Sequence, residues 1–210
     1  VACCTLSVFA FTRYADNLLL GVYCQAALFV SIMETLFVAN SMLIASVFNY
    51  QCLSNFNSPM MMSKGLNDFW GKRWNMTVHR MLKSLYFQPV MEATGSRLIA
   101  TCAAFVGSGL FHEAAFYLTV QAADKETSRM ALKFTGWQTA FFLTSSFLCY
   151  VERLVQKNFP KLTKNLNSMP WPVAPLLTTA LVLPTGFLFT VPLVEVGFVD
   201  SCVRSVIRVE

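Results

Sequence analysis

One apolar stretch of the chain contains two residues that can move protons. Residues 103–120 read AAFVGSGLFHEAAFYLTV, with His112 and Glu113 in the middle. Ionisable residues this deep in a segment suited to lipid are rare and face a protein interior or a water-filled cavity, so they indicate a functional site. A neutral imidazole accepts a proton near pH 7, which makes His112 a candidate general base that activates a hydroxyl group.

The residues around His112 are consistent with two hypotheses. Ser108 and Gly109 precede it by one helical turn, and their small size leaves space for a ligand beside the imidazole. The same residues also suit close packing of a neighbouring helix, which His112 would then only hydrogen-bond. Glu113 points about 100° away around the helix. We therefore expect Glu113 to pair with a basic side chain on another helix rather than to act as a second catalytic acid.

The same segment also indicates how an activated hydroxyl would react with an acyl donor. It contains no G-x-S-x-G nucleophile motif, which favours direct attack by an acceptor hydroxyl over a covalent acyl-enzyme. If the helix begins at Leu98, His112 lies about 20 Å along it, at about 1.5 Å per residue. A water-soluble acyl donor needs a long arm to reach that depth, as in a thioester on a pantetheine chain.

A second segment combines aromatic, basic and amide side chains. Residues 67–80 read NDFWGKRWNMTVHR, and apolar residues recur at helical spacing from Leu66 to Leu85. This pattern predicts an amphipathic helix in the membrane interface, with tryptophans at headgroup depth and basic side chains toward water. Such a helix could serve as a lipid anchor alone. Asn75, beside Trp74, indicates a role beyond anchoring, because an amide near lipid needs a hydrogen bond from a buried partner or a substrate.

The composition places both segments in a membrane protein. Hydrophobic residues make up 55% and charged residues 13%, with 19 Phe and a mean hydropathy of +0.52, whereas soluble domains carry about 25% charged residues. The net charge of +5 arises from basic residues in particular loops, as a bilayer orientation signal requires, so we expect no nucleic-acid partner. The seven cysteines form no C-x-x-C pair and none lies at ligand spacing from a histidine, so we expect no metal site.

The apolar runs predict an all-α polytopic membrane protein with four or five spans and no soluble domain. Basic residues concentrate before Leu98 and after Val151, so both loops are expected on the cytosolic side. The last span contains Pro184 and Pro192, which neighbouring helices can accommodate. The expected parts are an N-terminal apolar part at 1–62 with one or two spans within 18–48, a cytosolic interfacial segment at 63–97, spans at 98–120, 131–151 and 171–199, and a tail at 200–210.

Two motifs in order resemble a known family. LNDFWGKRWNMTVHRMLKSLYFQPV, residues 66–90, followed by FVGSGLFHEAAFYL, residues 105–118, resembles the wax-synthase-like branch of the membrane-bound O-acyltransferase (MBOAT) superfamily. That branch typically shows D-F-W-G-R-R-W-N and then S-G-L-x-H-E, and here Lys72 stands where arginine is commoner. The resemblance covers about Ser63 to Val196. Two motifs at the right separation are more specific than either motif alone.

The resemblance implies an MBOAT-like multi-helix bundle in the endoplasmic reticulum membrane, with a fatty acyl group transferred from acyl-CoA to the hydroxyl of a lipophilic alcohol. His112 would be the catalytic base and Asn75 a second active-site residue. Acyl-CoA would be a co-substrate, and no cofactor is expected. We also expect substrate contacts, with the basic side chains near the CoA phosphates because of their charge, from Trp70, Lys72, Arg73, Trp74, Arg80, Ser108 and Gly109.

Alternatives remain at this point. Members of the family often carry more spans before the first motif, so we expect this chain to be a fragment. A truncated relative that serves as a membrane scaffold or lipid-binding protein is the alternative to an enzyme. A transporter would also explain Glu34, His112 and Glu113 within apolar runs, but no internal repeat is visible in the sequence.

Overall fold

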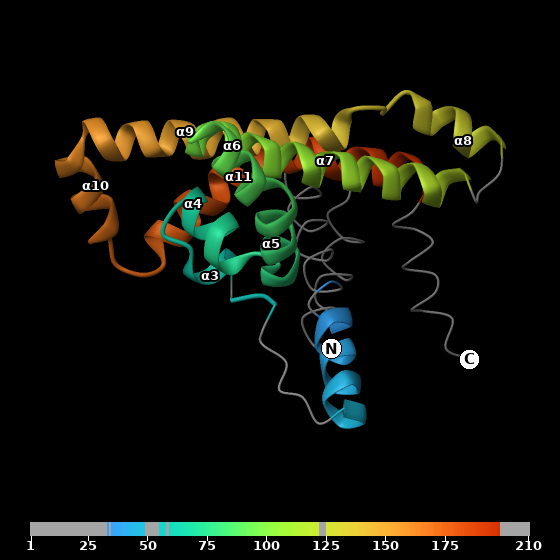
Figure 1. The fold of residues 1–210 in the computed structure, drawn as a ribbon, viewed down its shortest axis with the longest axis horizontal. Coiled ribbons are helices and arrows are strands. Elements are labelled where there is room, and N and C mark those ends of the chain that lie inside the picture. Colours follow the sequence, from blue (N-terminus) through green and yellow to red (C-terminus); the bar gives the residue numbers. More distant parts are fainter. Residues whose placement is uncertain (1–32, 34, 49–54, 58, 122–124, 198–210) are drawn as a thin grey trace. The chain divides into compact units, whose positions relative to one another are not determined.

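The computed structural model describes residues 33, 35–48, 55–57, 59–121 and 125–197, and the regular elements among them are all helices (Figure 1). An apolar helix, Thr35–Phe48, comes first. The expectations for Glu34, for most of 18–34 and for the tail at 200–210 lie outside the described residues. The later elements, with η for a π-helix, are α3 Pro59–Met62, α4 Leu66–Asp68, η1 Phe69–Arg73, α5 Met76–Leu82, η2 Lys83–Phe87, α6 Gln88–Thr94, α7 Arg97–Gln121, α8 Lys125–Leu132, α9 Trp137–Asn158, α10 Pro160–Asn167 and α11 Val173–Glu195.

The chain divides into two compact units. Unit 1 comprises Val1–Arg80 and Val155–Leu183, and unit 2 comprises Met81–Leu154 and Pro184–Glu210. The aromatic and basic motif of residues 67–80 therefore belongs to unit 1, and the segment with His112 belongs to unit 2. Each group of candidate residues is described within its own unit below.

Two of the described helices are long and apolar enough to cross a membrane. They are α7, with a hydropathy of 1.4, and α11, with a hydropathy of 1.8. Their positions correspond to the segments expected at 98–120 and 171–199. Pro184 and Pro192 lie inside α11 without ending it. Each proline lacks one backbone donor, and α11 continues past both positions.

The segment expected at 131–151 differs from the observed helix. Its first residues belong to the end of α8 and to a turn, and α9 starts only at Trp137. Gly136, with φ of 89°, takes a left-handed conformation that favours glycine and ends the turn. The C-terminal part of α9 also contains charged residues such as Glu152 and Arg153, so its apolar stretch is shorter than those of α7 and α11.

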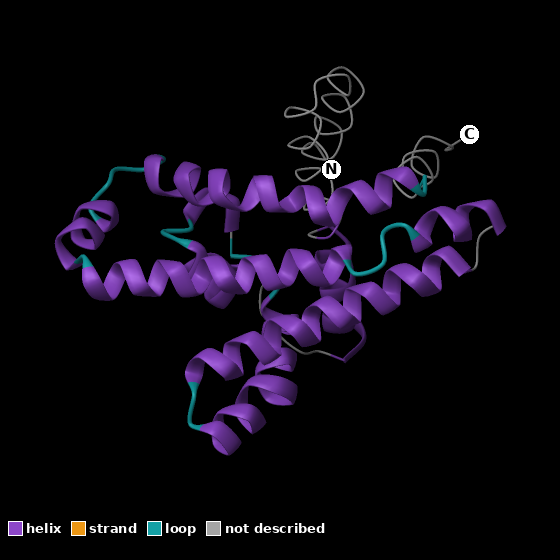
Figure 2. Cartoon of the chain, turned by 90° about the horizontal axis from the view of Figure 1, so that it is seen from above, coloured by secondary structure: helices purple, strands orange, loops and turns teal. Residues whose placement is uncertain are grey.

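Within unit 2, α7, α9 and the C-terminal half of α11 run side by side (Figure 2). Their contacts include the hydrogen bond from Gln138 Nε2 to the Phe189 carbonyl oxygen, at 3.0 Å. At the α8 end, Phe116, Val120 and Ala131 form a buried cluster against which Leu193 packs. In unit 2, α7 therefore packs against both α9 and the C-terminal half of α11. It is the helix that carries His112.

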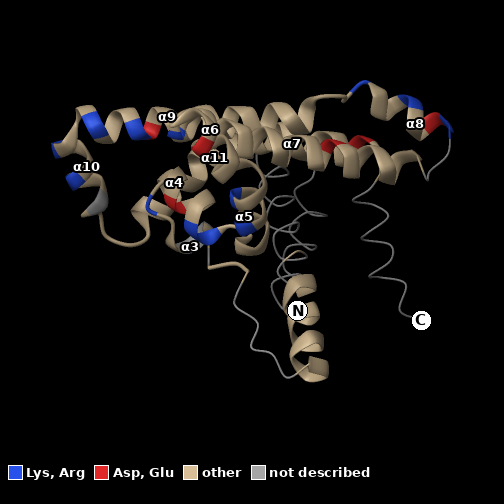
Figure 3. Cartoon of the chain, in the orientation of Figure 1, with Lys and Arg blue, Asp and Glu red and all other residues tan. Residues whose placement is uncertain are grey.

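Charged side chains mark the ends of the long helices. α11 has no Lys or Arg, and basic residues occur on α10 and the adjoining end of α9 (Figure 3). These basic residues, Lys157, Lys161 and Lys164, are exposed. Lys157 lies on α9, and Lys161 and Lys164 lie on α10, so this part of the expected basic loop is helical.

Candidate functional site

The motif segment of unit 1 is a broken helix, so the expectation of one continuous amphipathic helix from Leu66 to Leu85 is wrong. η1 ends at Arg73, Trp74 is extended with φ of −83° and ψ of 125°, and Asn75 has φ of 33°. α5 then starts at Met76. The apolar spacing holds within each piece, but the left-handed residue turns the second piece onto a new axis.

Asn75 is suited to this break by its side chain. Its Oδ1 accepts a hydrogen bond from the Val78 N–H at 3.2 Å, and its carbonyl accepts one from the His79 N–H at 2.9 Å. Asn75 is therefore the N-cap of α5, a position that favours asparagine. Asparagine also tolerates the left-handed region better than most residues. The half-buried amide thus has a partner within its own turn, which satisfies one of its groups without a substrate.

A neighbouring segment fixes the break from outside. The Met76 N–H donates to the Asn55 carbonyl at 2.7 Å, and the Asn57 N–H donates to the Arg73 carbonyl at 2.9 Å. Because these bonds take up backbone groups on both sides of Asn75, the two helical pieces cannot rejoin into one helix without losing them.

Trp74 is the centre of an aromatic cluster in unit 1. It stacks on Phe69 with ring centroids 5.4 Å apart, and it meets Phe56 and Trp70 edge-on at 5.4 and 5.9 Å. Phe69 is 2% exposed. Such aromatic pairs contribute about 0.5–1.5 kcal/mol beyond their buried area. The tryptophans that were expected to bind substrate are therefore half-buried and packed against other rings.

The three basic candidates of this segment have different surroundings. Arg73 is tied down: its Nε lies 2.6 Å from Asp68 Oδ2, and its Nη1 donates to the Asn57 carbonyl at 3.1 Å. Lys72 has a side chain 78% exposed and reaches Asp68 only at 4.0 Å. Arg80 is exposed. Lys72 and Arg80 thus have heads in solvent that can meet phosphate groups, whereas Arg73 supports the fold of the segment.

Asp68 is the acidic partner of Arg73 in this ion pair. Partial burial disfavours its charged form, but hydrogen bonds from Arg73 and from the Lys64 N–H, together with the charges of Arg73 and Lys72, favour that form and hold the pKa of Asp68 below its usual value. The carboxylate therefore stays ionised throughout the physiological range. It keeps Arg73 directed inward, next to the aromatic cluster.

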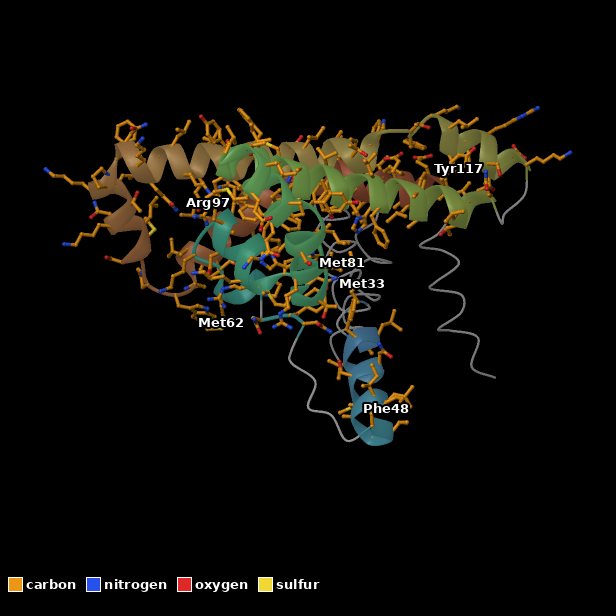
Figure 4. The ribbon with its side chains drawn as sticks, viewed as in Figure 1. Met33, Phe48, Met62, Met81, Arg97 and Tyr117 are labelled. Carbon is orange, nitrogen blue, oxygen red and sulfur yellow. The ribbon has the colours of Figure 1, made fainter. Side chains whose placement is uncertain are left out.

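His112 lies in unit 2, on the stretch of α7 between Arg97 and Tyr117, the two α7 residues that Figure 4 labels. Its Nδ1 is 2.8 Å from the Ser108 carbonyl oxygen. A carbonyl can only accept a hydrogen bond, so Nδ1 carries the hydrogen and, in the neutral ring, Nε2 keeps the lone pair. The half-buried imidazole lies against the rings of Phe142 at 4.7 Å and Phe189 at 5.4 Å.

Glu113 has a different partner from the one that was expected. Its Oε1 accepts a hydrogen bond from the Gly136 N–H at 2.7 Å, and its Oε2 accepts one from the Thr139 N–H at 3.3 Å. No basic side chain lies within ion-pair distance of it in the described part of the chain. Among the described residues, Glu113 thus pairs with backbone N–H groups and not with the basic side chain that was expected. The first turn of a helix offers unpaired N–H groups and a positive dipole end, and the Glu113 carboxylate caps α9 there.

The small residues before His112 serve helix packing. A Cβ atom added to Gly109 would lie 2.8 Å from the Thr139 Cα atom, so the backbones of α7 and α9 meet at this point. Ser108 is 4% exposed and supplies the carbonyl that holds His112. Of the two hypotheses for these residues, the structure supports close helix packing at Gly109, and Ser108 orients the imidazole.

Gln138 is a buried polar residue that the sequence did not predict. Gln138, in the first turn of α9, is 1% exposed. A single amide at the start of an apolar run has no recognisable pattern, so only the packing of α9 against its neighbours identifies it. Among the described residues, no group of three His, Cys, Asp or Glu could hold a metal ion.

Together, the described residues define an α-helical protein with two helices of membrane-spanning length, one of which carries an oriented imidazole among aromatic rings. Comparison with known proteins agrees with this class and specifies it. The model described as the membrane bound O-acyl transferase family matches residues 52–144, which include both motifs. This part of the chain is therefore similar to that family.

Curated relatives cover most of the chain. A protein of Arabidopsis thaliana named probable long-chain-alcohol O-fatty-acyltransferase 9 is 28% identical over 90% of this chain and 53% of its own length. The long-chain-alcohol O-fatty-acyltransferase of Simmondsia chinensis is 28% identical over 78% of this chain and 45% of its own length. Acyl-CoA–sterol O-acyltransferase 1 of Arabidopsis thaliana is 24% identical over 86% and 49%. The chain thus spans about half the length of the curated relatives it matches. No solved structure matches it.

Proposed function

We propose that the protein is an acyl-CoA-dependent O-acyltransferase that esterifies a lipophilic alcohol, with His112 as general base. The observation that carries the proposal is the orientation of the imidazole. Its Nδ1–H is held by the Ser108 carbonyl at 2.8 Å, and this leaves Nε2 as the basic nitrogen. A general base needs this fixed tautomer, because the proton must arrive at a defined atom.

The proposed reaction is a single transfer. His112 Nε2 removes the proton of the alcohol hydroxyl while the oxygen attacks the thioester carbonyl carbon, and a new C–O bond forms. The C–S bond breaks, and the imidazolium returns the proton to the departing thiolate. The products are the ester and CoA with a free thiol, and His112 is neutral again. Aromatic neighbours that exclude water favour the alcohol over hydrolysis.

The unit 1 motif contains the basic side chains proposed to bind the CoA phosphates of the donor. Lys72 and Arg80 have solvent-exposed heads of the right charge for CoA phosphates. Asn75, which the resemblance implies as a second active-site residue, has an amide N–H₂ group that can donate a hydrogen bond, in addition to capping α5 through its oxygen. We place the protein in the endoplasmic reticulum membrane as a multi-pass protein.

The acceptor is proposed as a long-chain alcohol or a sterol. These are the acceptors that the names of the relatives print. An apolar environment such as that of α7 and α11 suits either one, since only the hydroxyl needs a polar partner.

The test is ester synthesis in microsomes. The chain is expressed in a host that makes no neutral lipid, and microsomes receive labelled acyl-CoA with a panel of fatty alcohols and sterols. We expect a new labelled ester that microsomes of the empty host do not form, and the panel identifies the acceptor. Stable insertion of the chain without any new ester would instead favour a scaffold or lipid-binding role.

Asn75 variants separate capping from catalysis. Asn75→Asp keeps a capping oxygen and tolerates the left-handed backbone, so the free energy of unfolding should change by less than about 0.5 kcal/mol. It removes the amide N–H₂ donor, so we expect ester formation to fall about tenfold, the value of one hydrogen bond. Asn75→Ala should lose about 1 kcal/mol of stability as well. Full activity in Asn75→Asp would show that Asn75 acts only as a cap.

A further inference from the structure

Gln138 leaves one half of a buried amide unpaired. Its side chain is 1% exposed, and its Nε2 donates to the Phe189 carbonyl at 3.0 Å. Among the described residues, its Oε1 is buried and has no hydrogen-bond partner. The positions of Nε2 and Oε1 cannot be exchanged. Oε1 would then face the Phe189 carbonyl oxygen, and both atoms are acceptors. Buried acceptors in proteins are nearly always paired, so Oε1 calls for a donor that the described residues do not supply.

This oxygen belongs to the surroundings of His112. α7 and α9 are antiparallel, with Gly109 against Thr139 and Glu113 bonded to the N–H groups of Gly136 and Thr139. The first turn of α9, which contains Gln138, is therefore level with the turn of α7 that contains His112.

Two aromatic residues connect Gln138 to the imidazole. Phe142 follows Gln138 by one turn of α9, and its ring lies 4.7 Å from that of His112. Phe189 offers its carbonyl to Gln138, and its ring lies 5.4 Å from that of His112. Gln138 therefore bonds to Phe189 and precedes Phe142 by one turn, and the rings of these two phenylalanines lie against His112 within unit 2.

The chemistry of the reactants identifies the donor. The alcohol has one hydroxyl proton, and His112 takes it. The acyl chain and the thioester group have no N–H or O–H. The pantetheine arm, in contrast, has an amide N–H two carbons from the thioester sulfur, and that group keeps its hydrogen throughout the reaction.

We propose that Gln138 Oε1 accepts a hydrogen bond from the pantetheine amide nearest the thioester and so sets the depth of the acyl donor beside His112. This inference rests on the proposed function, since it takes acyl-CoA as the donor. It makes Gln138 a binding residue for the thioester arm.

Two short thioesters test the contact. One is the acyl thioester of N-acetylcysteamine, which has the amide N–H. The other is the acyl thioester of 2-acetoxyethanethiol, in which an ester oxygen replaces that N–H and the length is unchanged. Binding is measured by displacement of labelled acyl-CoA from the purified full chain, and ester formation is measured in parallel. The wild-type chain is expected to bind the amide compound about tenfold more tightly, the effect of one buried hydrogen bond.

Three variants assign the preference to Gln138. Gln138→Met has a similar volume but no acceptor, and we expect it to bind the two thioesters equally. In Gln138→Glu, burial favours the protonated carboxyl, whose O–H can donate to the Phe189 carbonyl while the other oxygen remains an acceptor, so this variant should keep a preference for the amide compound. Gln156→Met is the matched control, because Gln156 is an exposed glutamine on the same helix, and it should retain the full preference.

The outcomes separate this inference from the proposed function. Equal binding of the two thioesters by the wild-type chain, or an unchanged preference in Gln138→Met, overturns the role of Gln138 even if ester is formed. A preference that Gln138→Met abolishes, in a chain that forms no ester, supports the binding contact and overturns the enzymatic proposal. A wild-type chain that binds neither thioester overturns both. The wild-type comparison needs no variant, so it decides the matter even if Gln138→Met does not fold.

Discussion

Replacement of His112 by alanine is expected to lower the rate of ester formation by about 10²–10⁴-fold, the usual contribution of a general base. The imidazole is oriented by the Ser108 carbonyl and lies against two phenylalanine rings, and no other described side chain of unit 2 is comparably placed to accept a proton. Glu113 cannot replace it, because both of its oxygens already bind N–H groups of α9. The measurement is the initial rate with labelled acyl-CoA and the acceptor identified in microsomes.

The control for this variant is His79→Ala. His79 is the other histidine of the chain, lies on α5 and is half-buried, so its replacement tests whether loss of any imidazole lowers activity. His79→Ala should retain a rate within a few-fold of wild type. Both variants should reach the membrane in equal amounts. A rate for His112→Ala near that of His79→Ala would exclude a general base at position 112.

The orientation of the imidazole depends on the attachment of α7 to α9, and Glu113 contributes to this attachment. Its carboxylate joins the middle of α7 to the first turn of α9 through two backbone N–H groups. The adjacent turn of α7 is fixed by the contact between Gly109 and Thr139. His112 lies between these two attachments along the chain, so its ring is placed by neighbours that make no contact with the reacting groups. In the proposed reaction His112 is the base, and Glu113 is a structural anchor.

Parts of this arrangement follow from sequence and parts do not. The positions of α7 and α11 were predicted closely, because a long apolar run has few alternatives to a helix. The break at Asn75 was not, because helical spacing of apolar residues is insensitive to one left-handed residue between two helical pieces. The partner of Glu113 was also missed. Its direction on α7 was predicted, but the identity of the neighbour depends on which end of which helix packs there. Gln138 needed the tertiary structure for the same reason.

The contact between Gly109 and Thr139 predicts the second large effect. Gly109→Ala places a Cβ atom 2.8 Å from the Thr139 Cα atom, and a backbone atom cannot rotate away as a side chain can. α7 and α9 must then separate, which we expect to lower the free energy of unfolding by about 1–3 kcal/mol. The separation also moves His112 relative to its neighbours. A displacement of about 1 Å in an active site reduces the rate by about 10²-fold.

Two other glycines make the prediction specific to backbone contact. For a Cβ atom added to Gly107, the three nearest atoms all belong to the ring of Tyr86, the first at 2.6 Å, and Tyr86 is 39% exposed and can swing outward. Gly107→Ala should therefore be clearly milder than Gly109→Ala. Gly186→Ala, on α11, meets no atom within 4 Å and should leave stability and activity unchanged or slightly improved. Thermal unfolding in detergent and initial rates rank the three variants. Equal effects of Gly107→Ala and Gly109→Ala would mean that α7 and α9 are not in backbone contact beside His112, because only that contact distinguishes the two positions.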